Sequence, residues 1–311
     1  MISSIFGKTK PINFIIVAGF VLFFYLTVQN FLFEQSFLSN GTAQKILVLG
    51  SLLFSVFVVD FIVKKNKLTG PNSYAILFFA ILLVVFPESL GDDNAVLCSF
   101  FLLLATRRLL SVKSLKSIRL KIFDASLWIL VSSIFYDWAV LYLTLVMVTI
   151  YVYDAKNIKN WLAIFSAVLC FSMILVSTVL LLDKTDFLTD HYDFSINIEA
   201  IYPLHWTSSI KVSLYIFINV VLSIWTFLKL SNAGLGKIIT IRLITFSFLL
   251  GLIVNLLVIS RNGNAIMVTF FPSIILLTNY VESIRKEKFR ELVLLGCILV
   301  PIVVFVSRLL I

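Results

Sequence analysis

The chain contains 311 residues, of which 60% are apolar and 13% charged, and its formal net charge is +9. Soluble domains contain roughly 45–50% apolar and about 25% charged residues, and a chain of this length cannot bury such an excess in one core. The composition therefore excludes a soluble globular protein and predicts a membrane protein. Two histidines are too few for a site with three or four histidine ligands, and the three separated cysteines give no zinc or disulfide pattern.

Apolar runs, taken in chain order, predict eleven membrane-spanning helices. The first run follows Lys8 and Lys10 without a cleavage signal, so it is an uncleaved span rather than a signal peptide. Several runs are shorter than the roughly 20 residues that a bilayer requires, which predicts tilted helices or local thinning. The whole chain, 1–311, is thus expected to form one all-α, polytopic transmembrane domain, with spans at 11–28, 46–63, 73–87, 94–106, 122–136, 138–153, 161–182, 209–228, 238–259, 265–281 and 292–309.

The boundary between the fifth and sixth spans is set by Asp137. A continuous helix over 122–153 would be about 48 Å long, at 1.5 Å per residue, which is too long for one crossing. Asp137 is the one charge between residues 125 and 153, and Tyr136 and Trp138 flank it. Aromatic residues beside a charge are typical of the membrane interface, so we expect an exposed hairpin tip here.

The distribution of basic residues predicts the orientation. With eleven spans and a cytoplasmic N-terminus, 20 of the 25 lysines and arginines fall on the cytoplasmic side, as the positive-inside rule requires. This arrangement predicts a C-terminus on the outer side, which is the periplasmic side if the membrane is a bacterial inner membrane. The basic charge is then explained by topology and by attraction to anionic lipids, and binding to nucleic acid is not implied.

Two segments outside the spans are longer than turns. Residues 107–121 alternate apolar and basic positions at helical spacing, which predicts a cytoplasmic amphipathic helix bound to anionic lipid headgroups. A sharper alternative is a surface that binds a lipid-linked diphosphate or a protein partner. Residues 183–208 contain five carboxylates, both histidines and several aromatic residues, which favours a folded periplasmic cap loop over a disordered one.

Few polar residues lie at bilayer depth. Asn13, Asn219 and Asn255 are the main ones, and asparagine in such positions more often joins helices than binds a ligand. Repeated halves and broken spans are also missing, so transport ranks behind the other functions.

The polar residues that could carry out chemistry lie instead at the predicted periplasmic interface. Asp92 and Asp93 could act as catalytic acids or bases, or hold a divalent cation, but they also suit the capped start of the next helix. Glu34 is a further catalytic candidate, with a solvated loop residue as the alternative. The candidates for substrate binding are Asp137, His205 and Arg261, and Arg261 could also simply extend to the interface.

Taken together, this layout resembles the polytopic GT-C glycosyltransferases, which use polyprenyl-phosphate sugars. The similarity rests on the span number, an acidic pair in the second outer loop, a long later outer loop, and Arg261 preceding a span that contains Pro272. The resemblance implies sugar transfer from a lipid-phosphate carrier, with Glu34 or the pair Asp92/Asp93 as general base and Arg261 against the departing phosphate. The chain departs from the family in its first outer loop, where Glu34 is the only acid.

A second resemblance is to an uncharacterised family of multi-pass inner-membrane proteins from Bacteroidota. It rests on the sequences GKTKPINF, FDASLW and FFPSIILLTNYVES, and it implies no activity. The alternative to sugar transfer is a non-enzymatic membrane subunit of a cell-envelope assembly, such as one for secretion or surface export. That alternative predicts apolar faces for membrane protein partners and no carboxylate cluster.

Overall fold

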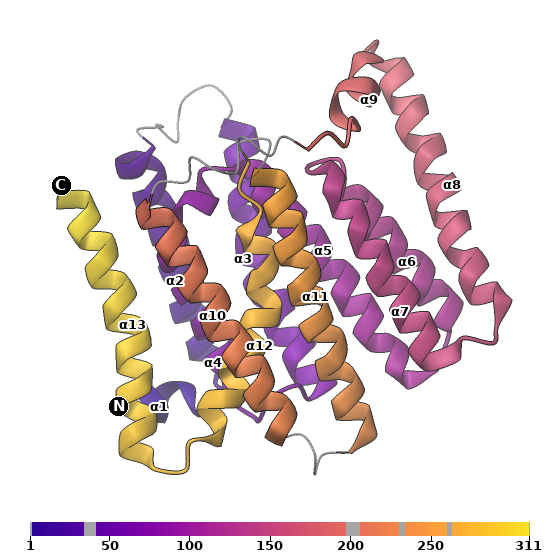
Figure 1. Ribbon diagram of the computed structural model, residues 1–311. Helices are drawn as coiled ribbons and strands as arrows, with labels where there is room; N and C mark the ends of the chain where they lie inside the picture. The colour runs from indigo at the N-terminus through magenta and orange to yellow at the C-terminus, as the bar shows by residue number, and fades with distance from the viewer. Residues whose placement is uncertain (1, 34–41, 197–205, 230–233, 260–262, 311) are drawn as a thin grey trace.

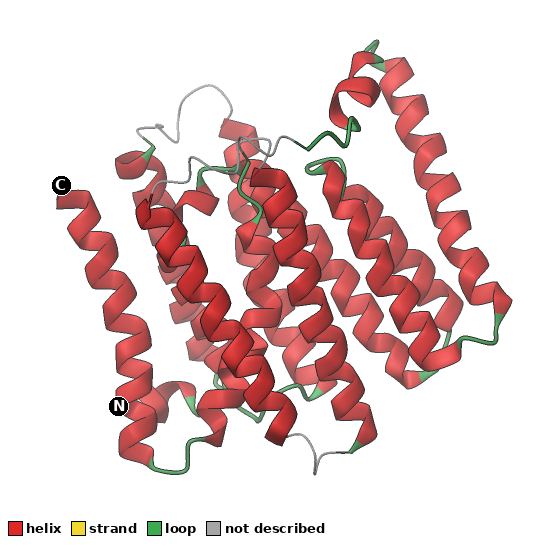
Figure 2. Cartoon of the chain, in the orientation of Figure 1, coloured by secondary structure: helices red, strands yellow, loops and turns green. Residues whose placement is uncertain are grey.

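The computed structural model describes residues 2–33, 42–196, 206–229, 234–259 and 263–310. Within these residues the regular secondary structure is entirely helical, which confirms the all-α fold (Figures 1 and 2). The α-helices are α1 (Ile2–Phe6), α2 (Pro11–Thr27), α3 (Thr42–Asn66), α4 (Tyr74–Val85), α5 (Asp93–Ser111), α6 (Ile118–Ser132), α7 (Leu143–Asp154), α8 (Ile158–Leu181), α9 (Asp186–His191), α10 (Trp206–Lys229), α11 (Leu235–Ile259), α12 (Phe270–Ser283) and α13 (Glu287–Leu310).

Five short helical segments adjoin them. A π-helical turn, η1 (Val28–Leu32), extends α2, and four 3₁₀ segments follow along the chain: η2 (Pro87–Leu90), η3 (Val112–Ser114), η4 (Asp137–Tyr142) and η7 (Ile266–Thr269). Because η4 and η7 lead directly into α7 and α12, each lengthens an otherwise short crossing.

Each of the eleven predicted spans coincides with a helix. Within the described ranges, nine helical segments are long and apolar enough to cross a membrane. Helices α4 and α6, with 12 and 15 residues, are not among them, since at 1.5 Å per residue they extend over about 18 and 22 Å, against a hydrocarbon layer of about 30 Å. A membrane protein with many apolar helices is therefore supported, and the count of eleven crossings stays a prediction.

The most buried helices lie in the middle of the bundle. In the most apolar window of each crossing, 72% of residues are buried for Ile266–Ser283 and 67% for Asp93–Ser114, against 22% for Ile158–Leu181 and 11% for Glu287–Ser307. Figure 1 shows α8 and α13 on opposite flanks of the bundle. These two flanking helices thus leave the largest share of their apolar windows to face lipid or another protein.

The contacts between connecting segments show which of these segments lie together at each of the two ends of the helix bundle. At the first, which we call the Asp92 end, Asp92 binds both Tyr136 and Asn264. At the opposite or basic end, Glu282 accepts a hydrogen bond from Asn72. All of these contacts join segments that the positive-inside rule assigns to the same side of the membrane.

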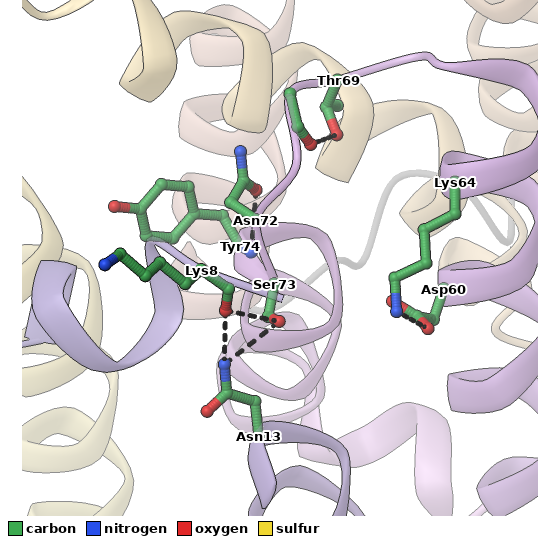
Figure 3. A network of polar contacts seen from close by, with 9 residues as sticks. Lys8, Asn13, Asp60, Lys64, Thr69, Asn72, Ser73 and Tyr74 are labelled. Atoms are coloured by element: carbon green, nitrogen blue, oxygen red, sulfur yellow. Dashed lines mark hydrogen bonds and ion pairs between the residues drawn. The ribbon is translucent and has the colours of Figure 1, made fainter. Parts of the chain in front are cut away.

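Asparagine joins helices at the basic end, as expected for Asn13 (Figure 3). Its Nδ2 atom donates to the Lys8 carbonyl at 2.9 Å and to Ser73 Oγ at 3.1 Å, which ties the start of α2 to the start of α4. Asn72 Oδ1 in turn accepts a hydrogen bond from the Tyr74 amide at 3.1 Å. These bonds fix the N-terminal segment against the bundle.

The expected amphipathic helix over 107–121 does not form as one unit. Helix α5 continues to Ser111, and after η3 the backbone becomes left-handed at Leu115 (φ 55°) and Ser117 (φ 49°) before α6 begins at Ile118. Left-handed residues interrupt a right-handed helix, so the segment is a tight turn between two antiparallel helices.

Packing explains why the turn is preferred. Leu109 and Val112, which we expected on a lipid-facing surface, are buried inside the bundle. Lys121 closes the turn, since its Nζ atom donates to the Ser111 carbonyl at 2.7 Å and to Ser114 Oγ at 2.6 Å. The turn buries these apolar side chains against neighbouring helices. A separate amphipathic helix on the membrane surface would remove them from that packing, so the turn is the more stable arrangement.

Candidate functional site

The start of α5 is fixed by Asp92. Asp92 precedes the helix in an extended conformation, and its Oδ1 atom accepts hydrogen bonds from the amides of Asn94 at 3.1 Å and Ala95 at 3.3 Å. An aspartate in this position satisfies amides that have no partner within the helix. The capping role that the sequence left open as an alternative is therefore present.

The other carboxylate oxygen of Asp92 joins two distant segments. Its Oδ2 atom accepts a hydrogen bond from the Tyr136 hydroxyl and one from the Asn264 amide at 3.3 Å. Tyr136 follows α6, and Asn264 precedes η7, so three connecting segments meet at one carboxylate. A Cβ atom on Gly263 would lie 3.2 Å from the Tyr136 ring. Because glycine has no side chain, the backbone can pass close to Tyr136 at this position.

Tyr136 belongs to the candidate site, but the sequence did not identify it as the hydrogen-bond partner of Asp92. The sequence placed it only as an interfacial residue flanking Asp137. A phenol has an ordinary pKa of about 10, so at neutral pH Tyr136 keeps its proton and donates a hydrogen bond to the Asp92 carboxylate. The available sequence signal was an aromatic hydroxyl next to a predicted turn, which does not identify a partner 44 residues away.

Asp93 is less constrained than Asp92. It lies half-buried in the first turn of α5, and its Oδ2 atom accepts a hydrogen bond from Gln44 Nε2, near the start of α3, at 2.8 Å. No described contact engages its second carboxylate oxygen as an acceptor. Of the two acids in the predicted pair, Asp93 is therefore the one with an oxygen available to a substrate.

Asp137 lies at the tip of the α6–α7 hairpin, but it is not exposed there. The residue is 3% accessible, and its Oδ1 atom accepts a hydrogen bond from the Trp138 amide at 2.8 Å. Trp138 contacts the ring of Phe194 edge-on, with 5.3 Å between centroids. The expectation of a solvent-exposed carboxylate is therefore wrong, because η4, which begins at Asp137, packs against α6 and α11.

Residues 183–196 of the predicted cap pack on this hairpin, whereas its last residues, 206–208, form the start of α10. His191 Nε2 lies 2.7 Å from the Ser133 carbonyl, and the Tyr192 hydroxyl lies 3.1 Å from Ser133 Oγ. The rings of Phe187 and His191 stack at 4.8 Å. This segment is folded where it is described, and its closure over the whole face stays a prediction.

An ion pair outside the predicted site also lies at the Asp92 end. Lys211 Nζ is 2.9 Å from both carboxylate oxygens of Glu88, and it lies 5.1 Å from the centroid of the Phe86 ring. This pair joins η2 to the start of α10. Glu88 is thus occupied as a structural partner.

Three predicted site residues lie outside the described residues: Glu34, His205 and Arg261. Within the described ranges, no three side chains among histidine, cysteine, aspartate and glutamate come together as metal ligands. Asp92 and Asp93 could therefore hold a divalent cation only with ligands from elsewhere.

The indole N–H of Trp138 is buried and has no hydrogen-bond partner in the described part of the chain, and such groups at a site call for an explanation.

No family model matches the chain, and comparisons with curated proteins and with solved structures give no match either. The functional interpretation therefore rests on the arrangement of residues at the two ends of the bundle.

Proposed function

We propose that the protein transfers a sugar from a lipid-phosphate carrier at the Asp92 end of the bundle, in the manner of the GT-C glycosyltransferases. We assign this end to the periplasmic face of a bacterial inner membrane. The observation that supports the proposal is the meeting of Asp92, Tyr136 and Asn264 at one point. This contact joins the acidic loop before α5 to the segment that begins with Arg261, which are the two motifs of the resemblance.

The geometry favours different roles for the two acids. Asp92 uses both carboxylate oxygens in hydrogen bonds, so we assign it as a positioning residue that holds the site together. Asp93 has an oxygen available, so we assign it as general base. In the proposed step, the acceptor hydroxyl gives its proton to Asp93 and its oxygen bonds to the anomeric carbon, while the bond from that carbon to the lipid-phosphate oxygen breaks.

The departing lipid phosphate needs positive charge nearby. Arg261 is the candidate from the resemblance, because a guanidinium binds phosphate oxygens with two parallel hydrogen bonds. Glu34 and His205 remain candidates for the acceptor side.

The test compares Asp93→Asn with Asp190→Asn. Asp190 is an exposed carboxylate at the end of α9, so its substitution makes the same chemical change at the same end of the bundle. Each variant is returned to a strain that lacks the protein, and lipid-linked sugars and envelope glycans are measured by mass spectrometry. We expect Asp93→Asn to cause accumulation of a lipid-linked sugar and loss of one glycan at unchanged protein abundance. Full glycosylation in this variant would contradict the proposal.

A second candidate is a non-enzymatic membrane subunit. Two observations favour it. Structural hydrogen bonds occupy both carboxylate oxygens of Asp92, and only 11% of the residues in the apolar window of α13 are buried, so most of this helix presents an apolar surface outward. This function predicts that Asp93→Asn leaves glycans unchanged, while a charged substitution at Val303, which is exposed on α13, releases a co-purifying membrane protein. The two functions are thus separated by two independent measurements.

A further inference from the structure

A basic cavity lies at the end of the bundle opposite Asp92. Its volume is about 620 Å³, and its walls come from the ends of α3 and α5, from η3, and from the starts of α6 and α11. This volume is in the range of pockets that hold small-molecule ligands. Six basic side chains line it: Lys65, Arg107, Arg108, Lys113, Lys121 and Lys237. A seventh, Lys67, belongs to the segment after α3, and none of the described lining residues is acidic.

Several of these cations are held in place facing the cavity. The Arg107 guanidinium and Lys65 Nζ lie 4.8 and 5.1 Å from the centroid of the same ring, Phe61. Lys121 is held by its hydrogen bonds to the α5–α6 turn. The cationic groups are therefore preorganised, which lowers the entropic cost of binding an anion.

Few acids balance this charge. Among the described residues, Asp124 pairs with Arg108 at 3.0 Å, and Asp60 pairs with Lys64, which does not line the cavity. Burial, together with the neighbouring Lys65, Arg108 and Lys116, lowers the pKa of Lys121. The like charges thus repel one another, and an anion in the cavity would remove that repulsion.

The arrangement differs from what topology alone requires. The positive-inside rule needs basic residues on one side of the membrane, but it does not need them to converge on one volume. At the same end, Arg285, Lys286 and Lys288 are exposed on the segment around the start of α13 and contribute nothing to this cavity. The convergence of side chains from four helices indicates a binding site rather than a general surface charge.

We propose that the basic cavity binds a phosphate-bearing anion with at least two negative charges. Phosphate matches the site because guanidinium and ammonium groups both bind its oxygens strongly. The cavity lies where helices end, so either the headgroup of a lipid or a soluble phosphate compound could supply the anion. This site is separate from the proposed transferase site, and its failure would leave that proposal untouched.

The experiment uses the full-length protein in phosphatidylcholine nanodiscs and two probes. Inorganic pyrophosphate represents the soluble source, and its binding is measured by calorimetry. Phosphatidic acid, at 5% of the lipid, represents the headgroup source; its retention is measured by native mass spectrometry against phosphatidylglycerol, whose phosphate carries one charge. Pyrophosphate binding alone identifies a soluble ligand, and selective retention of phosphatidic acid alone identifies a lipid.

The variant Lys65→Gln/Lys113→Gln/Lys237→Gln removes three exposed lining charges that make no described hydrogen bond to the bundle. The control Arg285→Gln/Lys286→Gln/Lys288→Gln removes three exposed charges from the same end. A charge-assisted hydrogen bond contributes roughly 1.5–3 kcal/mol, and 1.4 kcal/mol is tenfold in affinity.

We therefore expect the cavity variant to bind its probe at least about tenfold more weakly, and the control to bind as the natural protein does. Arg107→Gln, which removes one half-buried charge, should weaken binding in the same direction. Equal losses in both triple variants, or binding of neither probe to the natural protein, would overturn the proposal.

Discussion

Asp92→Ala should lower the stability of the folded protein, because one carboxylate caps a helix and joins two other segments. The substitution removes the cap of α5, which contributes about 1 kcal/mol. It also removes the acceptor for the Tyr136 hydroxyl and the Asn264 amide. Hydrogen bonds to a charged group contribute roughly 1.5–3 kcal/mol each, although polar contacts in membrane proteins average lower values. We expect a total loss of about 3–4 kcal/mol.

A graded series tests this reasoning. Asp92→Asn keeps the cap, since asparagine and aspartate cap helices equally well, but the NH₂ group that replaces Oδ2 cannot accept a hydrogen bond from the Tyr136 hydroxyl or from the Asn264 backbone N–H. The loss should be about 1–2 kcal/mol. Tyr136→Phe removes one hydrogen bond and should cost about the same. Because both changes remove one shared interaction, the double variant should be less destabilised than the two single changes added together.

The assay is SDS-induced unfolding in mixed micelles, followed by fluorescence, with thermal unfolding in detergent as a second measurement. Asp190→Ala serves as the control, because this carboxylate is exposed on the short helix α9. The reasoning is refuted if Asp92→Ala is no less stable than Asp190→Ala. It is also refuted if the changes at Asp92 and Tyr136 prove additive, since the contact between them would then contribute nothing.

Three further outcomes are expected. A Cβ atom on Gly91 would lie 2.2 Å from the Phe33 ring, so Gly91→Ala should destabilise the protein by about 1–3 kcal/mol, and Phe33→Leu should relieve part of that loss; no relief would exclude the clash as the cause. Asp137→Cys should resist a membrane-impermeant thiol reagent that labels a cysteine on exposed positions of α9, because Asp137 is 3% accessible; rapid labelling would contradict its burial. A reporter fused after Ile311 should be periplasmic and reporters fused at Lys65 or Lys286 cytoplasmic, and a cytoplasmic C-terminus would contradict the model of eleven crossings.

The sequence by itself determined the class of protein and the places of its helices. Apolar runs long enough to cover a membrane can be found without knowledge of any partner, because each backbone amide in lipid must be satisfied within its own helix. This is why every predicted span coincides with a helix. The capping role of Asp92 could also be read locally, because it depends on amides two and three residues away.

Only the tertiary structure decided which polar groups meet. The contact from Asp92 to Asn264 joins residues 172 positions apart, and no periodicity in the sequence indicates such a pair. The basic residues of 107–121 could be recognised, but their partners across the cavity, Lys65 and Lys237, come from other helices. Likewise, Asp137 is buried because η4 packs against α6 and against the distant helix α11. Local patterns follow from the chemistry of adjacent residues, whereas these sites arise from how the helices pack side by side.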